Sequence, residues 1–475
     1  MKAILEQQFF WHFWQLLYPL FHCFISKMIH CSIIQKTQLE SGQRLDAEYY
    51  QPEYLDYSTQ LNKLSQVAIS DVCRVTDGNH LTISEQFADS GVRYLRGKDL
   101  QDFFLSDTDP MYIPEETYLK LKRSHVFQGD VLVSIVGTIG LVSVVADNFD
   151  KLTGSCKIAI LHPKNIDPWY LSAFLASTYG QFQLQRLTGG AVQTGVILKD
   201  MSTLRILRFG DDKENQIANM IKIAYEKQLE SKKLYQNAEN LLLQELGLIV
   251  YQISNDLAFE VYLSEVKNAE RMDADYFQPK YQWIIDKIGK KKRMSEMAKR
   301  IKNTGKHTPD TEYNYIEISD VNVSNGEITF NKIVGKELPA NAKIGLSGGE
   351  LIISKVRPTR GAIAIIPQEF SDNFIASGAF SVYNVDYPTR EYLQVVFRSI
   401  VGKLQLERPT TGTSYPTITD EDIENMWIPD LSLEIQQKIA DLVRRSHEAR
   451  KKSKALLEEA KRKVEEMIEK NDKKI

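Results

Sequence analysis

An eleven-residue stretch occurs twice in this chain. Arg44-Leu-Asp-Ala-Glu-Tyr-Tyr-Gln-Pro-Glu-Tyr54 returns as Arg271-Met-Asp-Ala-Asp-Tyr-Phe-Gln-Pro-Lys-Tyr281, with seven identical positions and three conservative ones. The remaining position, Glu53 against Lys280, reverses charge. A match this close indicates that the chain consists of two copies of one unit, about 220–230 residues apart.

The repeat continues in the same order along both halves, which is its main support. The further matching pairs are Gly78-Asn-His80 with Gly305-Lys-His307, Tyr94–Asp99 with Tyr315–Asp320, Gly129–Ser134 with Gly349–Ser354, Gly180–Thr188 with Gly402–Thr410, Gln216-Ile-Ala218 with Lys438-Ile-Ala440, and Ser231-Lys232 with Ser453-Lys454. The spacing drifts by only a few residues, as loop insertions would cause. We therefore predict a duplication of whole domains, because short-period solenoid repeats do not fit this pattern.

Composition places the chain among ordinary globular proteins, with 43% apolar and 25% charged residues over 475 positions. A chain of this length suggests roughly three domains at about 150 residues each. The net charge of −3 argues neither for nor against nucleic acid, because an average hides basic faces. The four cysteines are scattered, and the eight histidines form no metal-ligand cluster with them. We therefore expect a reduced, cytoplasmic chain without structural zinc or another cofactor.

The first 34 residues carry an apolar stretch that leaves three interpretations open. Residues 9–34 are rich in Phe, Trp, Leu and Ile, but the best uninterrupted piece, Leu16–Ile25, contains His22 and is shorter than the ~20 residues of a membrane span. No Ala-x-Ala cleavage site follows. The interpretations are an over-extended start with Met28 as the true initiator, a peripheral or core-packing helix, and a membrane span. The second copy has no counterpart of residues 1–27, which favours the interpretation of an over-extended start.

Both copies alternate strand-like runs, turn residues and helical periodicity, so we predict two α+β units. In the first copy a helical entry at 44–64 precedes strands at 72–76, 92–95, 131–136, 141–145 and 158–161 and a helix at 168–186. In the second copy the entry at 271–288 precedes strands at 315–318, 350–356, 362–366 and 381–383 and a helix at 390–406.

Each copy ends in a long amphipathic helix, at 214–247 and 433–469, with small residues along one face. A helix of about 33 residues is roughly 50 Å long. Because isolated helices are marginal in water, we expect the two to pack antiparallel, as a coiled coil with a globular unit at each end. The predicted segments are an N-terminal stretch at 1–43, globular domains at 44–212 and 249–430, and helices at 213–248 and 431–475.

These sequences in this order resemble the specificity subunit of type I restriction–modification systems. The resemblance covers residues 33–470 and is carried by Arg44–Pro52 and its second copy, by Gly129-Asp-Val-Leu and Gly349-Glu-Leu-Ile, by Thr410-Thr-Gly-Thr-Ser-Tyr-Pro416, and by Leu433–Ala440. Residues 1–27 depart from the family pattern.

The resemblance implies a function. Each globular unit would be a target-recognition domain that reads one half of a split site on double-stranded DNA, with the helices as a ruler between them. The chain would not be catalytic. It would position two methyltransferase subunits and, in the full complex, restriction subunits that translocate DNA, away from any membrane.

Catalytic motifs are absent from the sequence. We find no Gly-x-x-x-x-Gly-Lys-Ser/Thr, Asn-Pro-Pro-Tyr-like, Gly-x-Ser-x-Gly or His-Glu-x-x-His sequence, and we predict neither catalytic residues nor metal ligands. Two alternatives stay open. The chain could be a nuclease or methyltransferase with an unrecognised motif, or a membrane-anchored coiled-coil interaction protein, as residues 9–34 alone suggest.

DNA affinity needs Lys and Arg at phosphates, whereas sequence reading needs side chains that reach base edges. The candidates are Asn79 and His80 with Lys306 and His307 in the repeated Gly-x-His loop, Arg96 and Lys98, Lys290 and Lys291 in a basic run, Lys355, Arg357 and Arg360 after a strand, and Arg186, Gln193, Arg408, Ser414 and Tyr415 around polar glycine-rich loops.

Each candidate group also has a structural interpretation: a turn, a solvated charged face, or a helix-to-strand connection. Arg is the commonest specific reader of guanine in the major groove. The counterparts of Lys355, Arg357 and Arg360 near Ser134–Gly140 are uncharged, so we expect the units to read different half-sites. We assign the pairs Asp46/Asp273 and Tyr49/Tyr276 to structure.

Overall fold

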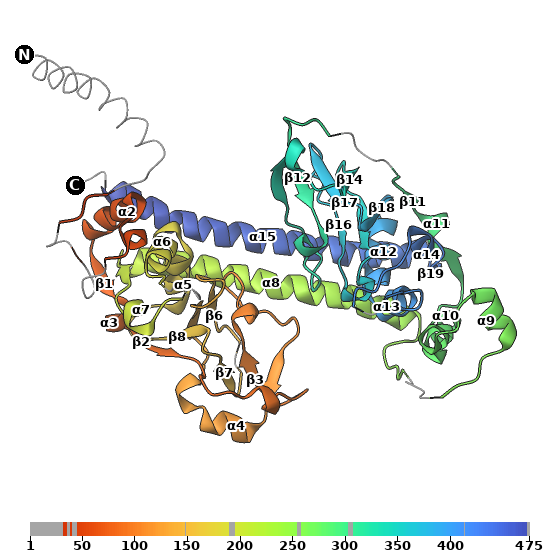
Figure 1. Ribbon diagram of the computed structural model, residues 1–475, viewed down its shortest axis with the longest axis horizontal. Coiled ribbons are helices and arrows are strands. Elements are labelled where there is room, and N and C mark those ends of the chain that lie inside the picture. The colour runs from red at the N-terminus through yellow and green to blue at the C-terminus, as the bar shows by residue number, and fades with distance from the viewer. Residues whose placement is uncertain are drawn as a thin grey trace, which may run out of the picture. The chain divides into compact units, whose positions relative to one another are not determined.

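The chain folds into two compact units (Figure 1). The computed structural model describes residues 32–35, 39, 45–147, 149–189, 195–253, 258–302, 307–412 and 414–472. Unit 1 comprises the residues up to Glu226 and those from Lys452 onward, and unit 2 comprises Lys227–Lys451. Most of the apolar N-terminal stretch, and with it the three interpretations above, lies outside the described residues.

Unit 1 opens with the short 3-10 helix η2 (Ala47–Tyr50) and with α2 (Pro52–Asn62). Pro52 stands at the start of α2, where a missing backbone N–H costs nothing. A four-stranded sheet has the order β2 (Cys73–Asp77), β8 (Ile158–Pro163), β5 (Val131–Ser134) and β6 (Val142–Val144). A three-stranded sheet has the order β4 (Met111–Ile113), β3 (Val92–Leu95) and β7 (Leu152–Gly154), and β1 (Gln66–Ala68) pairs with β9 (Arg205–Leu207).

The remaining short elements of unit 1 connect these strands. They are α3 (Ile69–Val72), η3 (Ser84–Gln86), η4 (Gly97–Asp99), α4 (Glu115–Lys120), η5 (Lys122–Ser124), α5 (Pro168–Ala176), α6 (Thr178–Arg186) and α7 (Leu198–Met201). Fully buried side chains of the four-stranded sheet, such as Val131 and Leu161, pack with Tyr170 and Phe174 of α5 in one core.

Unit 2 repeats this order of elements. Its four-stranded sheet runs β11 (Lys299–Arg300), β18 (Phe380–Asn384), β15 (Leu351–Ser354) and β16 (Ile363–Ile365), and β10 (Lys291–Arg293) pairs with β19 (Trp427–Pro429). The second sheet gains a strand and runs β13 (Asn331–Val334), β12 (Glu312–Ile316), β17 (Phe374–Ser377) and β14 (Ala342–Gly345). The other elements are α9 (Leu263–Ala269), η6 (Ala274–Phe277), α10 (Pro279–Lys287), α11 (Met294–Met297), η7 (Ile318–Asp320), η8 (Gly335–Glu337), η9 (Pro358–Arg360), α12 (Thr389–Arg398), α13 (Ile400–Glu407) and α14 (Asp420–Glu424).

The predicted α+β class and the predicted duplication are therefore confirmed, down to single hydrogen bonds. In unit 1 the buried hydroxyl of Tyr170 donates to the carbonyl oxygen of Leu207 at 2.7 Å. In unit 2 the hydroxyl of Tyr392 donates to the carbonyl oxygen of Pro429, also at 2.7 Å. Both bonds tie the first helix after the sheet to the strand that leads into a long helix.

The prediction of one helix at 168–186 and one at 390–406 was wrong, because each is broken in two at a serine. Ser177 separates α5 from α6, and its hydroxyl accepts a hydrogen bond from the backbone of Gly180. Ser399 separates α12 from α13 and caps α13 through Val401. A Cβ on Gly180 would lie 2.3 Å from the Phe174 carbonyl oxygen, so the sharp bend leaves room only for glycine. A serine followed three residues later by glycine was the overlooked signal.

The two long helices are present as predicted, as α8 (Asp211–Glu245) and α15 (Leu433–Asp472). They lie side by side within each unit (Figure 1). In unit 1, Ser453 Oγ donates to the Ala224 carbonyl oxygen at 2.6 Å. In unit 2, Ser446 Oγ donates to the Ser231 carbonyl oxygen at 2.7 Å.

The helices run antiparallel in unit 2. Ser446 of α15 donates to Ser231 of α8. The pKa of Lys438, earlier in α15, is raised by its hydrogen bond to Glu434 and also by the negative charge of Glu245, which comes later in α8 and lies nearby. Each unit includes buried residues from both helices: Ile217, Ile221, Val464 and Ile468 in unit 1, and Ala238, Leu242, Ile439 and Val443 in unit 2. The predicted domain boundaries, which set the helices apart as separate segments, stay predictions.

Candidate nucleic-acid interface

In each unit, backbone hydrogen bonds join loops that are distant in sequence, at the ends of strands of the four-stranded sheet. In unit 2 the Lys355 amide donates to the Ala379 carbonyl oxygen at 2.8 Å, and the Ile418 amide donates to the Lys355 carbonyl oxygen at 3.0 Å. In unit 1 the Ile135 amide donates to the Lys157 carbonyl oxygen at 2.9 Å, and the Val196 amide donates to the Ile135 carbonyl oxygen at 3.0 Å. We refer to residues 77–80, 135–137, 155–157 and 195–196 of unit 1, and to 355–360, 377–379, 411–412 and 414–418 of unit 2, as the loop edge.

The loop edge of unit 2 brings together five of the predicted DNA contacts, namely Lys355, Arg357, Arg360, Ser414 and Tyr415. Arg357 Nη2 donates to the Ser414 carbonyl oxygen at 3.0 Å, and its guanidinium carbon lies 4.4 Å from the centre of the Tyr415 ring. Tyr415 is 67% exposed. Lys355 comes from the same loop, but its ammonium pairs with Asp420 at 3.1 Å. Arg360 is exposed at the end of η9, and its amide donates to the Arg357 carbonyl oxygen at 3.0 Å.

Arg357 has an unusual backbone conformation, with φ 47° and ψ 53°. This left-handed conformation costs a non-glycine residue roughly 1–2 kcal/mol. In unit 1 the equivalent residue is Gly137, because Val136 pairs with Gly195 as Val356 pairs with Thr417. Gly137 has φ 82°. The same turn is therefore made by glycine in unit 1 and by a strained arginine in unit 2.

The Gly-x-His loop of unit 1 has one structural and one exposed residue. Asn79 is 6% exposed and closes its own turn, with Nδ2 donating to the Leu81 carbonyl oxygen at 2.9 Å and Oδ1 accepting from the Leu81 amide at 2.8 Å. His80 is exposed and pairs with Asp77 at 2.6 Å. Arg123 of the η5 turn also pairs with Asp77, at 2.8 Å. Arg123 was missed because nothing in the sequence links it to a loop more than 40 residues earlier.

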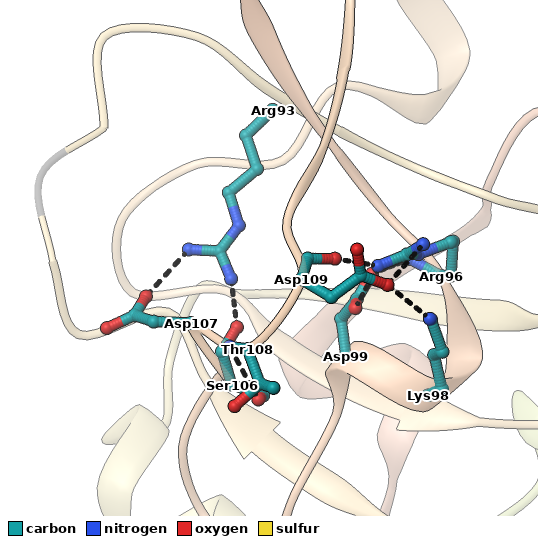
Figure 2. Close-up of polar contacts among 8 residues, drawn as sticks. All are labelled: Arg93, Arg96, Lys98, Asp99, Ser106, Asp107, Thr108 and Asp109. Atoms are coloured by element: carbon teal, nitrogen blue, oxygen red, sulfur yellow. Dashed lines mark hydrogen bonds and ion pairs between the residues drawn. The ribbon is translucent and has the colours of Figure 1, made fainter. Parts of the chain in front are cut away.

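Arg96 and Lys98 lie beside acidic groups (Figure 2). Arg96 makes a bidentate pair with Asp99 at 2.8 and 2.9 Å, and Lys98 Nζ donates to Asp109 at 2.7 Å. The hydrogen bond from Lys98 lowers the pKa of Asp109, and the bond to Asp99 raises the pKa of Arg96. Lys98 is well exposed and its ion pair is of the weak surface kind, so Lys98 is the more available of the two for a phosphate.

Arg186 and Arg408 occupy equivalent positions, and both contact the helical entry. Arg186 is 9% exposed, and its Nε donates to the Tyr49 carbonyl oxygen at 2.9 Å. Its guanidinium stacks on the Tyr49 ring at 4.1 Å, as that of Arg408 stacks on Tyr276 at 4.7 Å. These contacts favour a structural role, and we leave both arginines out of the proposed interface.

The basic run Lys290-Lys-Lys-Arg293 lies on and just before strand β10. This strand pairs with β19 in a two-stranded sheet and is not part of the loop edge. Lys290 is largely exposed and pairs with Asp430 at 2.8 Å, which lowers the pKa of Asp430. Lys291 Nζ donates to the Ile285 carbonyl oxygen at 3.1 Å. His307 donates from Nε2 to the Ala342 carbonyl oxygen at 2.6 Å and so holds its own unit together. Gln193 and Lys306 lie outside the described residues.

Neither a metal site nor a membrane span is found in the described part of the chain. No group of three or more His, Cys, Asp or Glu side chains is placed there to hold a metal ion. Among the helices described, none has the length and apolar character needed to cross a membrane.

Comparison with known proteins shows what part of the chain is similar to. Residues 287–461, which include most of unit 2, match the model of the type I restriction modification DNA specificity domain. A stretch of 131 residues, 26% of the chain, is 23% identical to the specificity subunit of the type I restriction enzyme HindI from Haemophilus influenzae. The match spans 28% of that relative's length.

Solved structures of specificity subunits align over most of the chain. The type I S subunit from M. genitalium is 13% identical, with 84% of this chain and 95% of that chain covered and a TM-score of 0.41. The HsdS subunit from Thermoanaerobacter tengcongensis is 15% identical, with 86% and 96% covered and a TM-score of 0.26. Because both TM-scores are below 0.5, the assignment of the specificity domain rests on the sequence match of residues 287–461.

Proposed function

We propose that this chain is the DNA sequence-recognition subunit of a type I restriction–modification complex. The observation that carries the proposal is the family match of residues 287–461 together with the loop edge in the same part of the chain. Unit 1 has the same strand order in its four-stranded sheet, and its loops are joined by equivalent backbone hydrogen bonds, so we extend the assignment to it.

The two units read the two halves of a bipartite site. Their loop edges have the same backbone plan but different side chains. Unit 2 presents Arg357, Arg360 and Tyr415. Unit 1 has glycine in place of Arg357 and presents His80 of its loop edge, with Arg123 of η5 paired to the same Asp77. Base edges are read by side-chain donors and acceptors, so different side chains on one plan select different half-sites.

The chain itself contributes no catalytic step in this proposal. It binds DNA in the cytoplasm and positions methyltransferase subunits, two in number, and restriction subunits on that site. We assign subunit docking to the outer faces of α8 and α15, whose facing sides are occupied by Ser231, Ser446 and the buried apolar residues.

Methylation sequencing of single DNA molecules tests the proposal. We expect a methylated split motif in cells that carry this gene with its methyltransferase, loss of the motif when this gene alone is deleted, and its return on complementation. Unchanged methylation after deletion, while the methyltransferase is still produced, would contradict the proposal.

The non-catalytic role has a test of its own. The purified chain should neither methylate DNA with S-adenosylmethionine nor cleave it with Mg²⁺, whereas addition of the purified methyltransferase should produce methylation at the split motif. Methyl transfer or cleavage by the chain alone would instead support the alternative of an enzyme with an unrecognised motif.

A further inference from the structure

The loop edges of the two units differ at the turn after β5 in unit 1 and after β15 in unit 2. Gly137 makes this turn in unit 1 and Arg357 makes it in unit 2, both with positive φ. Glycine adopts this conformation without a steric penalty, whereas arginine does not. Strained non-glycine residues cluster at functional sites, where their side chains are needed in a defined place.

The surroundings of Arg357 hold its side chain in a defined place. Its amide donates to the Pro416 carbonyl oxygen at 2.7 Å, and one guanidinium N–H donates to the Ser414 carbonyl oxygen. The Tyr415 ring lies against the guanidinium, within the range of a cation–π contact. Among the described residues, the hydrogen bond to Ser414 is the one that the guanidinium makes, and no carboxylate pairs with it. An arginine has five N–H donors, so most of the fork stays available.

The neighbouring cations are less suited to base reading. Lys355 pairs with both carboxylate oxygens of Asp420, which also pairs with Arg300 at 2.8 Å. A lysine is moreover a point charge, whereas the planar guanidinium matches two acceptors at once. Arg360 is exposed on η9 and has no aromatic or carbonyl partner that orients its guanidinium among the described residues.

We propose that Arg357 is the specificity-determining residue of unit 2, that it reads a guanine in the half-site of unit 2, and that Tyr415 is its positioning residue. The inference rests on the proposed function. A guanine presents O6 and N7 as two acceptors in the major groove, and the arginine fork donates to both. Unit 1 has no side chain at Gly137, so it reads its half-site through other loops.

The test uses the full chain in complex with its methyltransferase. The variant Arg357→Gly places in unit 2 the residue that unit 1 already has, so its backbone fits the turn. We expect one guanine of one half-site to become degenerate in the methylated motif while the other half-site stays unchanged. On synthetic duplexes, replacing that guanine should weaken binding of the wild-type complex about 5- to 150-fold and leave binding of the variant nearly unaffected.

Further variants separate the roles of charge, fork and ring. Arg357→Lys keeps the charge but not the fork and should relax the same position. Tyr415→Phe keeps the ring and should retain the specificity, whereas Tyr415→Ala should relax it. Arg360→Ala should weaken binding to all duplexes equally, as loss of a phosphate contact does.

The outcomes distinguish this inference from the proposed function. A wild-type complex that yields no split motif overturns both. A split motif that Arg357→Gly and Arg357→Lys both leave unchanged overturns only the role of Arg357, as does a relaxed position that is not a guanine. Circular dichroism of each variant checks that a lost motif does not come from unfolding.

Discussion

The side-chain amide of Gln405 holds both polar groups of the Trp427 backbone. Its Nε2 donates to the Trp427 carbonyl oxygen at 2.9 Å, and its Oε1 accepts from the Trp427 amide at 2.8 Å. In unit 1, Gln183 holds Arg205 in the same way, at 3.0 and 2.8 Å. In each unit the glutamine thus holds one strand of a two-stranded sheet, β19 in unit 2 and β9 in unit 1, just before the chain enters a long helix.

Removal of this clamp should destabilise unit 2. Gln405 is buried, so Gln405→Ala leaves the N–H and the carbonyl of Trp427 without partners. At about 1 kcal/mol for each lost hydrogen bond, we expect the free energy of unfolding to fall by roughly 2 kcal/mol. Denaturant unfolding of the purified chain measures the change. The control Gln282→Ala removes an exposed glutamine of α10 and should leave the midpoint nearly unchanged; equal effects of the two variants would refute the role of the clamp.

The bend between α12 and α13 depends on Gly402. A Cβ at this position would lie 2.4 Å from the Phe397 Cα, which is main chain and cannot swing away. Gly402→Ala should therefore lower the free energy of unfolding by about 1–3 kcal/mol, as overpacking does. Thermal unfolding followed by circular dichroism checks this. Gly345→Ala is the matched control, because a Cβ there meets nothing within 4 Å. An unchanged melting temperature for Gly402→Ala would show that the helices adjust to the methyl group.

His447 should make the stability of unit 2 depend on acid pH. Its burial, together with Arg450, Arg398 and Arg390, lowers its pKa to about 3. The unfolded chain binds a proton near the ordinary pKa of about 6.5, whereas the folded chain does not. Stability should therefore fall as the pH drops from about 6.5 toward 3, by up to about 1.4 kcal/mol per pH unit from this group. His447→Gln should flatten the dependence of the denaturation midpoint between pH 6.5 and 4.5, and an identical slope in both proteins would count against it.

Asp109 should weaken DNA binding by unit 1. Its carboxylate pairs with Lys98 at 2.7 Å and with Arg96 at 3.6 Å (Figure 2). Asp109→Ala frees Lys98 for a phosphate, so we expect tighter binding and a steeper dependence of log K on log salt, by about one unit. Fluorescence anisotropy at several salt concentrations measures the slope. Glu116→Ala removes a similar exposed partner, that of Lys120 on α4, and serves as the control. Equal slopes in both variants would place Lys98 outside the interface.

Much of the fold was predictable because its signals are local. The strand at 131–136 is a run of β-branched and apolar residues before a glycine turn, and it is found as β5. The helices at 214–247 and 433–469 lack internal Pro and Gly, and they are found as α8 and α15. The break at Ser177 was missed because apolar spacing continues across it, while the bend is imposed by the close approach of Gly180 to Phe174.

The candidate site was less predictable. Arg186 and Asn79 are polar residues beside glycine-rich loops, as DNA contacts often are. Both are nevertheless buried, and they donate hydrogen bonds to the backbone carbonyl oxygens of Tyr49 and Leu81. Charge in the sequence does not reveal whether a carboxylate lies opposite, as Asp99 lies opposite Arg96.

The sequence by itself determined the duplication, the α+β class of each copy and the two long helices, because identity between copies and apolar periodicity are properties of contiguous residues. Only the tertiary structure decided which side chains meet. Arg357 and Tyr415 are far apart in the chain and are joined because the loop after β15 and the loop after α13 share backbone hydrogen bonds. Those bonds depend on how the sheet and the helices pack, and no local pattern specifies them.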